Sequence, residues 1–346
     1  MADSKASRFL LGVVAAALLA VRPAHAVDQS LIDAARKEGT VVWYTTLIVD
    51  QLVRPVAAAF EKKYPGVKVS YVRNNSTETA VKIMNEAKAG KMQADVFDGT
   101  NTSTVLKKVN LVEAWKPDSA KDWPADVADP AGFWVATNVY VLTPGYNTEL
   151  IKKGTEPKTF EDLLDPKWKG KMVWNGSVST SGGPGFIGNV LHVMGEDKGM
   201  AYLQKLSAQK IVNLDVSARQ VLDQVIAGEY PMALQIFNHH TVISAKKGAP
   251  SDWIKMEPAT VVLQVASVAK GAQHPNAAKL LLDYLVSDEG QAFFRDADYL
   301  PASPRVPAPD PTLKPEGGHF QATVFSPDDV EDSMPKWKQV FDRYFR

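Results

Sequence analysis

Two adjacent histidines, His239 and His240, follow Asn238 and a compact apolar stretch, Met232 to Phe237. The length and composition of that stretch predict a buried strand. Neutral imidazole can bind a metal ion, and an imidazole N–H can donate a hydrogen bond to a carboxylate, phosphonate or phosphate group. Because ligands of open α/β sheets bind at the carboxyl ends of strands, we expect Asn238, His239 and His240 to contact a ligand.

A second group of polar residues, in the sequence NGSVSTSGGPGF, follows another predicted strand at Met172 to Trp174. Hydroxyl groups donate hydrogen bonds, glycine lets backbone N–H groups approach a ligand, and the N-terminus of the helix predicted near Pro184 favours negative charge. The group therefore indicates an oxyanion site, with an exposed Ser- and Gly-rich loop as the alternative interpretation. The spacing of a nucleotide-binding P-loop is missing. The candidate residues are Ser179, Thr180, Ser181 and Gly182.

Four further candidates follow predicted strands in the first third of the chain. Thr45 and Thr46 end an apolar stretch that begins at Thr40, and Asp98 and Thr100 follow the stretch ADVF. Each pair precedes a predicted helix. A repeat of strand, polar loop and helix is typical of a doubly wound α/β domain, so these side chains are expected to line one crevice. Helix capping by the same residues is the alternative interpretation.

The helix that precedes the histidine-bearing strand is bounded by local signals. Ser217 and Gln220 have the spacing of a capping box, and Gly228 lies where a left-handed residue would end the helix. Apolar residues recur at helical spacing between these two ends. The sequence therefore predicts a helix, a strand and a polar tip in succession.

The N-terminal 26 residues have the features of a secretory signal peptide. Lys5 and Arg8 precede an apolar run, and Ala24 and Ala26 give the small-x-small pattern of a cleavage site, so we expect cleavage after Ala26. No later stretch approaches 18 uninterrupted apolar residues. We expect an exported, soluble protein large enough for two domains, located in a bacterial periplasm.

The charge balance and the absence of cysteine exclude several classes of protein. Cleavage would leave 36 basic residues (39 less Lys5, Arg8 and Arg22) and 38 acidic residues (39 less Asp3). A chain so close to neutral lacks the basic surface that nucleic acids require. The sequence has no cysteine, which excludes disulfides and thiolate metal sites.

One long run, VYVLTPGYNTELIKKGTEPKTFEDLLDPKWKGKMVW, resembles the region after the first interlobe crossover in type II periplasmic substrate-binding proteins of bacterial ABC importers. The resemblance extends through VVWYTT, ADVFDGT, IAGEYPMAL and HPNAAKLLLDYLVSDEGQAFF, and so covers most of the chain. Within that superfamily the sequence is most similar to the branch of ferric-ion-binding and 2-aminoethylphosphonate-binding proteins.

This resemblance implies an α/β protein of two lobes, joined by crossover strands, with a ligand cleft that closes by hinge motion. Lobe one would comprise residues 27–134 plus about 261–294, and lobe two about 135–260. Residues 295–346 would form a C-terminal segment packed on the lobes. The partners implied are an ABC permease and its ATPase at the inner membrane, and the protein is expected to be a monomer without a cofactor.

The resembled ferric-binding proteins carry two adjacent tyrosines as iron ligands where this sequence has His239 and His240. Neutral imidazole suits zinc, copper, nickel or ferrous iron better than ferric iron. Adjacent side chains on a strand point to opposite faces, so both could bind one metal only if the chain leaves the strand there. The alternative is a hydrogen bond to an anion, with Arg219 nearby in the sequence.

These observations lead to the hypothesis of a periplasmic receptor for a small anionic ligand or a metal–anion complex. Asp215, Arg219 and Asn238 complete the candidate set from lobe two. Metal, phosphonate, phosphate ester and carboxylate all remain possible ligands. Hydrolase motifs are missing, so we expect no enzyme. An exported hydrolase using Asp98 and a histidine, and a sensor that presents ligand to a chemoreceptor, are the remaining alternatives.

Overall fold

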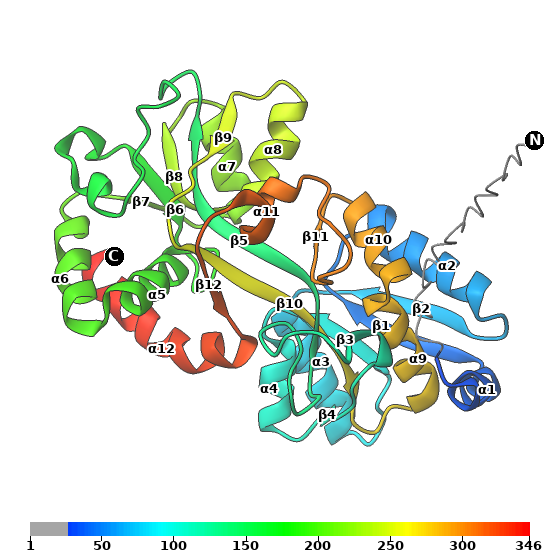
Figure 1. The fold of residues 1–346 in the computed structure, drawn as a ribbon. Coiled ribbons are helices and arrows are strands. Elements are labelled where there is room, and N and C mark those ends of the chain that lie inside the picture. Colours follow the sequence, from blue (N-terminus) through cyan, green and yellow to red (C-terminus); the bar gives the residue numbers. More distant parts are fainter. Residues whose placement is uncertain (1–26) are drawn as a thin grey trace, which may run out of the picture.

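The computed structural model describes residues 27–346, and the predicted signal peptide lies outside them. Two lobes are joined by two long strands, β5 (Val135–Asn147) and β10 (Ala259–Ala269), which run from one lobe into the other (Figure 1). These strands pair antiparallel, from Thr260 opposite Leu142 to Ala266 opposite Val135. The predicted two-lobed α/β fold with crossover strands is confirmed.

Lobe one is built on a sheet in the order β2-β1-β3-β10, in which β1 is parallel to both of its neighbours. The carboxyl ends of β1, β2 and β3 therefore lie at one edge of the sheet. Helices cover both faces. The elements are α1 (Gln29–Glu38), β1 (Thr40–Thr45), α2 (Arg54–Lys63), β2 (Lys68–Arg73), α3 (Ser76–Lys88), β3 (Val96–Gly99), α4 (Thr102–Lys108), β4 (Val112–Glu113), α9 (Pro275–Val286) and α10 (Asp288–Asp296).

Lobe two continues the same sheet in the order β5-β8-β6-β7, with β6 parallel to β7 and β8. The carboxyl ends of β6 and β8 therefore lie side by side, as the sequence pattern predicts. The elements are β6 (Met172–Asn175), α5 (Gly183–Met194), α6 (Glu196–Ser207), β7 (Val212–Leu214), α7 (Ala218–Ile226), β8 (Met232–Phe237), α8 (Asn238–Lys246) and β9 (Ser251–Trp253).

The C-terminal segment contacts both lobes. It contains β11 (Leu300–Pro301), α11 (Pro315–Gly318), β12 (Ala322–Phe325) and α12 (Pro327–Tyr344). Leu300, Leu313 and Phe320 pack into the core of lobe one, whereas Trp337 and Phe341 on α12 pack into the core of lobe two. Short helical turns lie at Val49–Val53, Asp118–Ala120, Glu161–Leu164, Pro166–Trp168 and Pro311–Leu313. Within residues 27–346, no helix is both long and apolar enough to cross a membrane.

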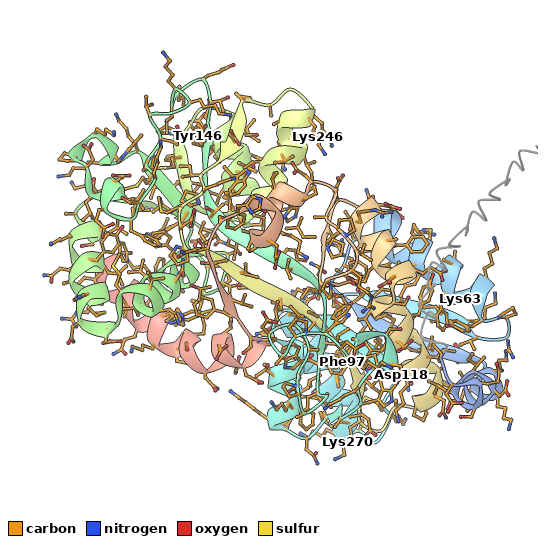
Figure 2. All side chains as sticks on the ribbon, in the orientation of Figure 1. Lys63, Phe97, Asp118, Tyr146, Lys246 and Lys270 are labelled. Carbon is orange, nitrogen blue, oxygen red and sulfur yellow. The ribbon has the colours of Figure 1, made fainter. Side chains whose placement is uncertain are left out.

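Each lobe has its own apolar core. Trp43, Phe60 and Tyr284 belong to the main cluster of lobe one, and Trp174 and Phe341 to that of lobe two. Figure 2 shows Phe97 inside lobe one and Tyr146 inside lobe two, and both side chains are buried. Separate cores let the two lobes move as rigid bodies about the strands that connect them.

Candidate ligand-binding cleft

A cleft of about 860 Å³ lies where the two lobes meet. Residues from the loop after β1, from β2 and α3, and from the loop after β3 form one wall, and β8 and α8 form the other. The lining includes Thr46, Arg73, Glu78 and Thr100 from lobe one, Tyr140 and Gln264 from the connecting strands, Phe237, His239, His240 and Lys247 from lobe two, and Asp298 and Tyr299 from the loop after α10.

His239 and His240 lie in the first turn of α8 and not at the end of a strand. Phe237 has extended backbone angles, and the chain becomes helical at Asn238. This change from strand to helix brings the two imidazole rings to the same side, with centroids 4.4 Å apart. Because the chain leaves the strand before the histidines, both rings can contact the same ligand.

The N-terminus of α8 keeps its anion-attracting character because no side chain caps it. Phe237 occupies the N-cap position and makes no side-chain cap hydrogen bond. The first N–H groups of a helix have no intrahelical partner, and the helix dipole places partial positive charge there. The two histidines therefore stand at a site suited to an anion.

Both histidines are neutral at pH 7. Burial, and then the neighbouring His240, hold the pKa of His239 well below its usual range. Burial, followed by the charge of Arg219, lowers the pKa of His240 to about 4. In the part of the chain that the structure describes, Nδ1 of each ring is buried without a hydrogen-bond partner. A neutral imidazole has one N–H donor and one acceptor nitrogen, and with Nδ1 buried, Nε2 is the nitrogen of each ring left for a ligand in the cleft.

This protonation state predicts a loss of stability in mild acid. The unfolded chain takes up protons near pH 6.5 whereas native His240 does so only near 4, so the free energy of unfolding falls as pH drops between these values. Between pH 7 and 4.5 the contribution of His240 should fall by roughly 2 kcal/mol. Urea titrations of wild type and His240→Gln at both pH values measure this difference. An equal acid sensitivity of the two proteins would show that His240 is not held neutral.

Aromatic rings form the floor of the cleft between its polar walls. Tyr140 stacks on His239 with centroids 6.1 Å apart, and its ring lies 5.0 Å from that of Phe237 and 6.5 Å from that of Tyr299. Burial raises the pKa of both Tyr140 and Tyr299, so both remain neutral phenols. The floor therefore offers apolar ring surface and neutral phenol groups to a ligand.

Asp98, predicted as a ligand contact, is fully buried behind the cleft. It accepts hydrogen bonds from Trp43 Nε1, Thr46 N and Gln264 Nε2, each at 2.8 Å, and from Thr46 Oγ1 at 2.9 Å. Burial raises the pKa of Asp98, and the hydrogen bonds oppose that shift. Thr45 is also buried, and its Oγ1 accepts the N–H of Leu47. Thr46 and Thr100 are the two of these four candidates that line the cleft.

The hydroxyl-rich loop before α5 folds tightly against lobe two. Ser179 Oγ lies 3.0 Å from Ser177 Oγ and 3.4 Å from Ser181 Oγ, and Gln235 Nε2 on β8 donates to the carbonyl of Thr180. Gly182 is the N-cap of α5 and makes no side-chain cap hydrogen bond. The loop is next to the histidine-bearing strand, but its residues are not part of the cleft lining. Its role as an oxyanion site stays a prediction.

The remaining candidates, Arg219, Asn238 and Asp215, do not line the cleft. Arg219 donates to Ser244 Oγ at 2.9 Å and to Asp223 Oδ1 at 2.8 Å. Asn238 is buried, and its Nδ2 donates to the carbonyl of Leu313, which fastens α8 to the C-terminal segment. Asp215 is exposed at the end of β7.

The cleft also contains residues that the sequence analysis missed. Arg73 is the last residue of β2. The rule that ligands bind at the carboxyl ends of strands, which identified Thr46 after β1, therefore also applies to Arg73. Gln264 is the polar residue in the otherwise apolar run VVLQVA, and a polar side chain expected to be buried needs hydrogen-bond partners. Lys247 follows the histidines by two helical turns and gave no comparable signal.

Donors for a metal ion are sparse. Among residues 27–346, no group of three or more His, Asp or Glu side chains is placed so that it could hold a metal ion. The histidine pair alone supplies two neutral nitrogen ligands, fewer than protein metal sites normally use.

Two lobes, two connecting strands and a polar cleft between them define a periplasmic binding protein. The sequence profile of the bacterial extracellular solute-binding proteins matches residues 56–320, and the chain belongs to this family. It is the solute-binding component of an ABC import system and not an enzyme. The family supports this function and gives no support to the hydrolase or chemosensor alternatives.

Several relatives have names that mention a ligand. A putative 2-aminoethylphosphonate-binding periplasmic protein of Salmonella typhimurium is 25% identical over 56% of this chain and 57% of its own. An Fe(3+)-binding periplasmic protein of Serratia marcescens is 26% identical over 71% of this chain and 73% of its own. The solved structure of the periplasmic binding protein AfuA from Actinobacillus pleuropneumoniae, with exogenous fructose-6-phosphate bound, is 26% identical, with a TM-score of 0.69 over 88% of this chain and 98% of that one.

Proposed function

We propose that this protein captures a small organic solute bearing a phosphate or phosphonate group and delivers it to an ABC permease. It acts as a monomer, reaches the periplasm through the N-terminal signal peptide, and closes its lobes over the ligand by hinge motion. The observation that carries the proposal is the uncapped N-terminus of α8, where His239 and His240 face a cleft that also contains Lys247.

The donors in the cleft suit a phosphoryl group. A phosphate or phosphonate presents three oxygens, which can accept hydrogen bonds from imidazole N–H groups and from the first N–H groups of α8. Lys247 and Arg73 supply positive charge from opposite walls of the same cleft. Closure would bring both walls onto the ligand, so ligand binding shifts the population towards the closed state.

The body of the proposed ligand is a small polar molecule. A volume of about 860 Å³ greatly exceeds that of a single metal ion, even allowing for contraction on closure. Support also comes from the 26%-identical structure with bound fructose-6-phosphate and from the relatives named for 2-aminoethylphosphonate. A metal receptor with His239 and His240 as ligands is less well supported, because no group of three or more His, Asp or Glu side chains among residues 27–346 is placed to hold a metal ion.

A thermal-shift panel tests this proposal. The chelator-treated protein is mixed with fructose 6-phosphate, 2-aminoethylphosphonate, inorganic phosphate, fructose, citrate, ferric citrate and zinc at equal concentration. A ligand at about 100 times its dissociation constant adds roughly 2.7 kcal/mol of stability. We expect a shift with one or more of the organic phosphorus compounds and none with fructose. A shift with zinc or ferric citrate alone would reject the proposal.

Two adjacent lysines provide a matched test of the cleft wall. Lys247 lines the cleft, whereas Lys246 on α8 does not and is exposed (Figure 2). Lys247→Ala should weaken binding of the phosphorylated ligand about threefold to tenfold, since an exposed charge contributes roughly 1 kcal/mol. Lys246→Ala should leave the affinity unchanged in the same calorimetric titration. Equal effects of both substitutions would mean that only the overall charge matters.

A further inference from the structure

Asp98 fixes the direction of the hydroxyl hydrogen of Thr46. Both the N–H and the Oγ1 hydroxyl of Thr46 lie within hydrogen-bond distance of Asp98 Oδ1, at 2.8 and 2.9 Å. Gln264 Nε2 donates to the same hydroxyl oxygen at 2.5 Å, so the oxygen is already an acceptor on that side. A hydroxyl group has one hydrogen, and here that hydrogen points to the carboxylate.

Both N–H groups of the Gln264 amide are also occupied by hydrogen bonds within the protein. Its Nε2 group donates to Thr46 Oγ1 and to Asp98 Oδ1, at 2.5 and 2.8 Å. The reverse orientation of the amide would place its oxygen against a carboxylate that also accepts from Trp43 Nε1. The amide orientation is therefore set by Asp98, and Oε1 is what Gln264 retains for a ligand.

The two cleft-lining side chains that Asp98 holds thus offer acceptors and no donors. Thr46 keeps a lone pair, and Gln264 keeps its carbonyl oxygen. Glu78 and Asp298, which also line the cleft, are carboxylates and add acceptors. Arg73, Gln51 and Asn74 carry donor groups on the lobe-one wall, so acceptor character belongs to the Thr46 and Gln264 corner and not to the whole wall.

We propose that Thr46 and Gln264, positioned by Asp98, form a subsite that recognises hydrogen-bond donors on the ligand. The inference rests on the proposed function: the phosphoryl end binds at α8, and the other end carries a hydroxyl or ammonium group that donates to this corner. Thr46 and Gln264 are specificity-determining contacts. Asp98 is a positioning residue, because it is buried and acts through the other two.

Pairs of compounds that differ only in their donor groups test the subsite. Calorimetry compares 2-aminoethylphosphonate with ethylphosphonate for the ammonium group, and glycerol 3-phosphate with propyl phosphate for hydroxyl groups. The wild type should bind the donor-bearing member of one pair at least tenfold more tightly, and the pair that shows this identifies the donor. Equal affinities within both pairs would overturn the subsite while leaving the proposed function intact. Absence of binding by all four compounds and by fructose 6-phosphate would overturn both.

Substitutions at Thr46 assign the discrimination to this corner. Thr46→Val removes the acceptor and should reduce the affinity ratio within the discriminating pair to below threefold, with the donor-free member bound as before. Thr46→Ser restores the hydroxyl and should keep the wild-type ratio. A ratio that survives in Thr46→Val would contradict the inference.

Substitution of Asp98 tests positioning apart from stability. In Asp98→Asn the amide can donate to Thr46 Oγ1, which frees the hydroxyl hydrogen to face the cleft. The ratio within the pair should then fall, whereas a merely destabilised protein would lose affinity for both members alike. Should Asp98→Asn fail to fold, Gln264→Leu removes one of the two groups that Asp98 positions, and the ratio within the pair should fall in that variant as well. An unchanged ratio in a folded variant counts against the positioning role.

Discussion

A protein in which His239 and His240 are both replaced by alanine is expected to bind its phosphorylated ligand at least a hundredfold more weakly than wild type. Hydrogen bonds to a charged group contribute about 1.5 to 3 kcal/mol each, and the two rings stand together at an uncapped helix N-terminus. Loss of both therefore removes roughly 3 kcal/mol or more of binding free energy. Isothermal titration calorimetry at pH 7 measures the change in dissociation constant.

The control for the double variant is His192→Ala. His192 is exposed on α5, where its ring contacts Phe325 at 5.5 Å, and it does not line the cleft. The control should bind like wild type, and circular dichroism should show that both variants are folded. Binding by the double variant within threefold of wild type would mean that the phosphoryl group is held elsewhere, with the loop at Ser179 to Gly182 as the next candidate.

The largest loss of stability is expected from Phe341→Ala. Phe341 is fully buried on α12, with its ring 5.8 Å from Trp174, and a Cβ on Gly183 would lie only 2.4 Å from it. Removing a buried phenylalanine costs about 3 to 5 kcal/mol, because the cavity left behind is only partly filled. Urea unfolding followed by tryptophan fluorescence measures the loss, since Trp174 reports on this core directly.

The Phe341→Ala variant also tests which contacts attach α12 to the two lobes. Lys107 on α4 forms an ion pair with Asp328 at the start of α12, at 3.0 Å. Exposed pairs of this kind contribute at most about 1 kcal/mol, so the apolar end of α12 must fasten the helix. Phe293→Ala, at a partly buried position in lobe one, is the matched control and should cost less. Equal losses would show that the packing of α12 is not the dominant contribution.

Local sequence signals were sufficient for much of the fold. The predicted strand at Met232 to Phe237 has the observed bounds, and Ser217 forms the predicted capping box with Gln220. These features depend on residues close in sequence, which is why periodicity and capping rules identify them. The two-lobed arrangement came from the family resemblance, because the pairing of β5 with β10 joins residues more than a hundred positions apart.

The candidate site was predicted less completely, for reasons that particular residues make clear. The strand-end rule located Thr46, His239 and His240 in the cleft, but it could not show that the chain enters a helix at Asn238. Asp98 followed the same rule and yet is buried, because its partners are distant in sequence: Gln264 is 166 positions away. Which polar side chain faces the ligand and which one supports it depends on such long-range contacts.

The most direct test of the account is a nuclear magnetic resonance titration of protein labelled with ¹⁵N-histidine. The ring nitrogens of His239 and His240 are assigned with the single His→Gln variants, and the protein is titrated with the phosphorus compound that gives the largest thermal shift. The account predicts that these nitrogens change resonance on binding, that the ³¹P signal of the ligand shifts with them, and that His192 does not respond. Saturated binding with unchanged His239 and His240 signals would contradict it.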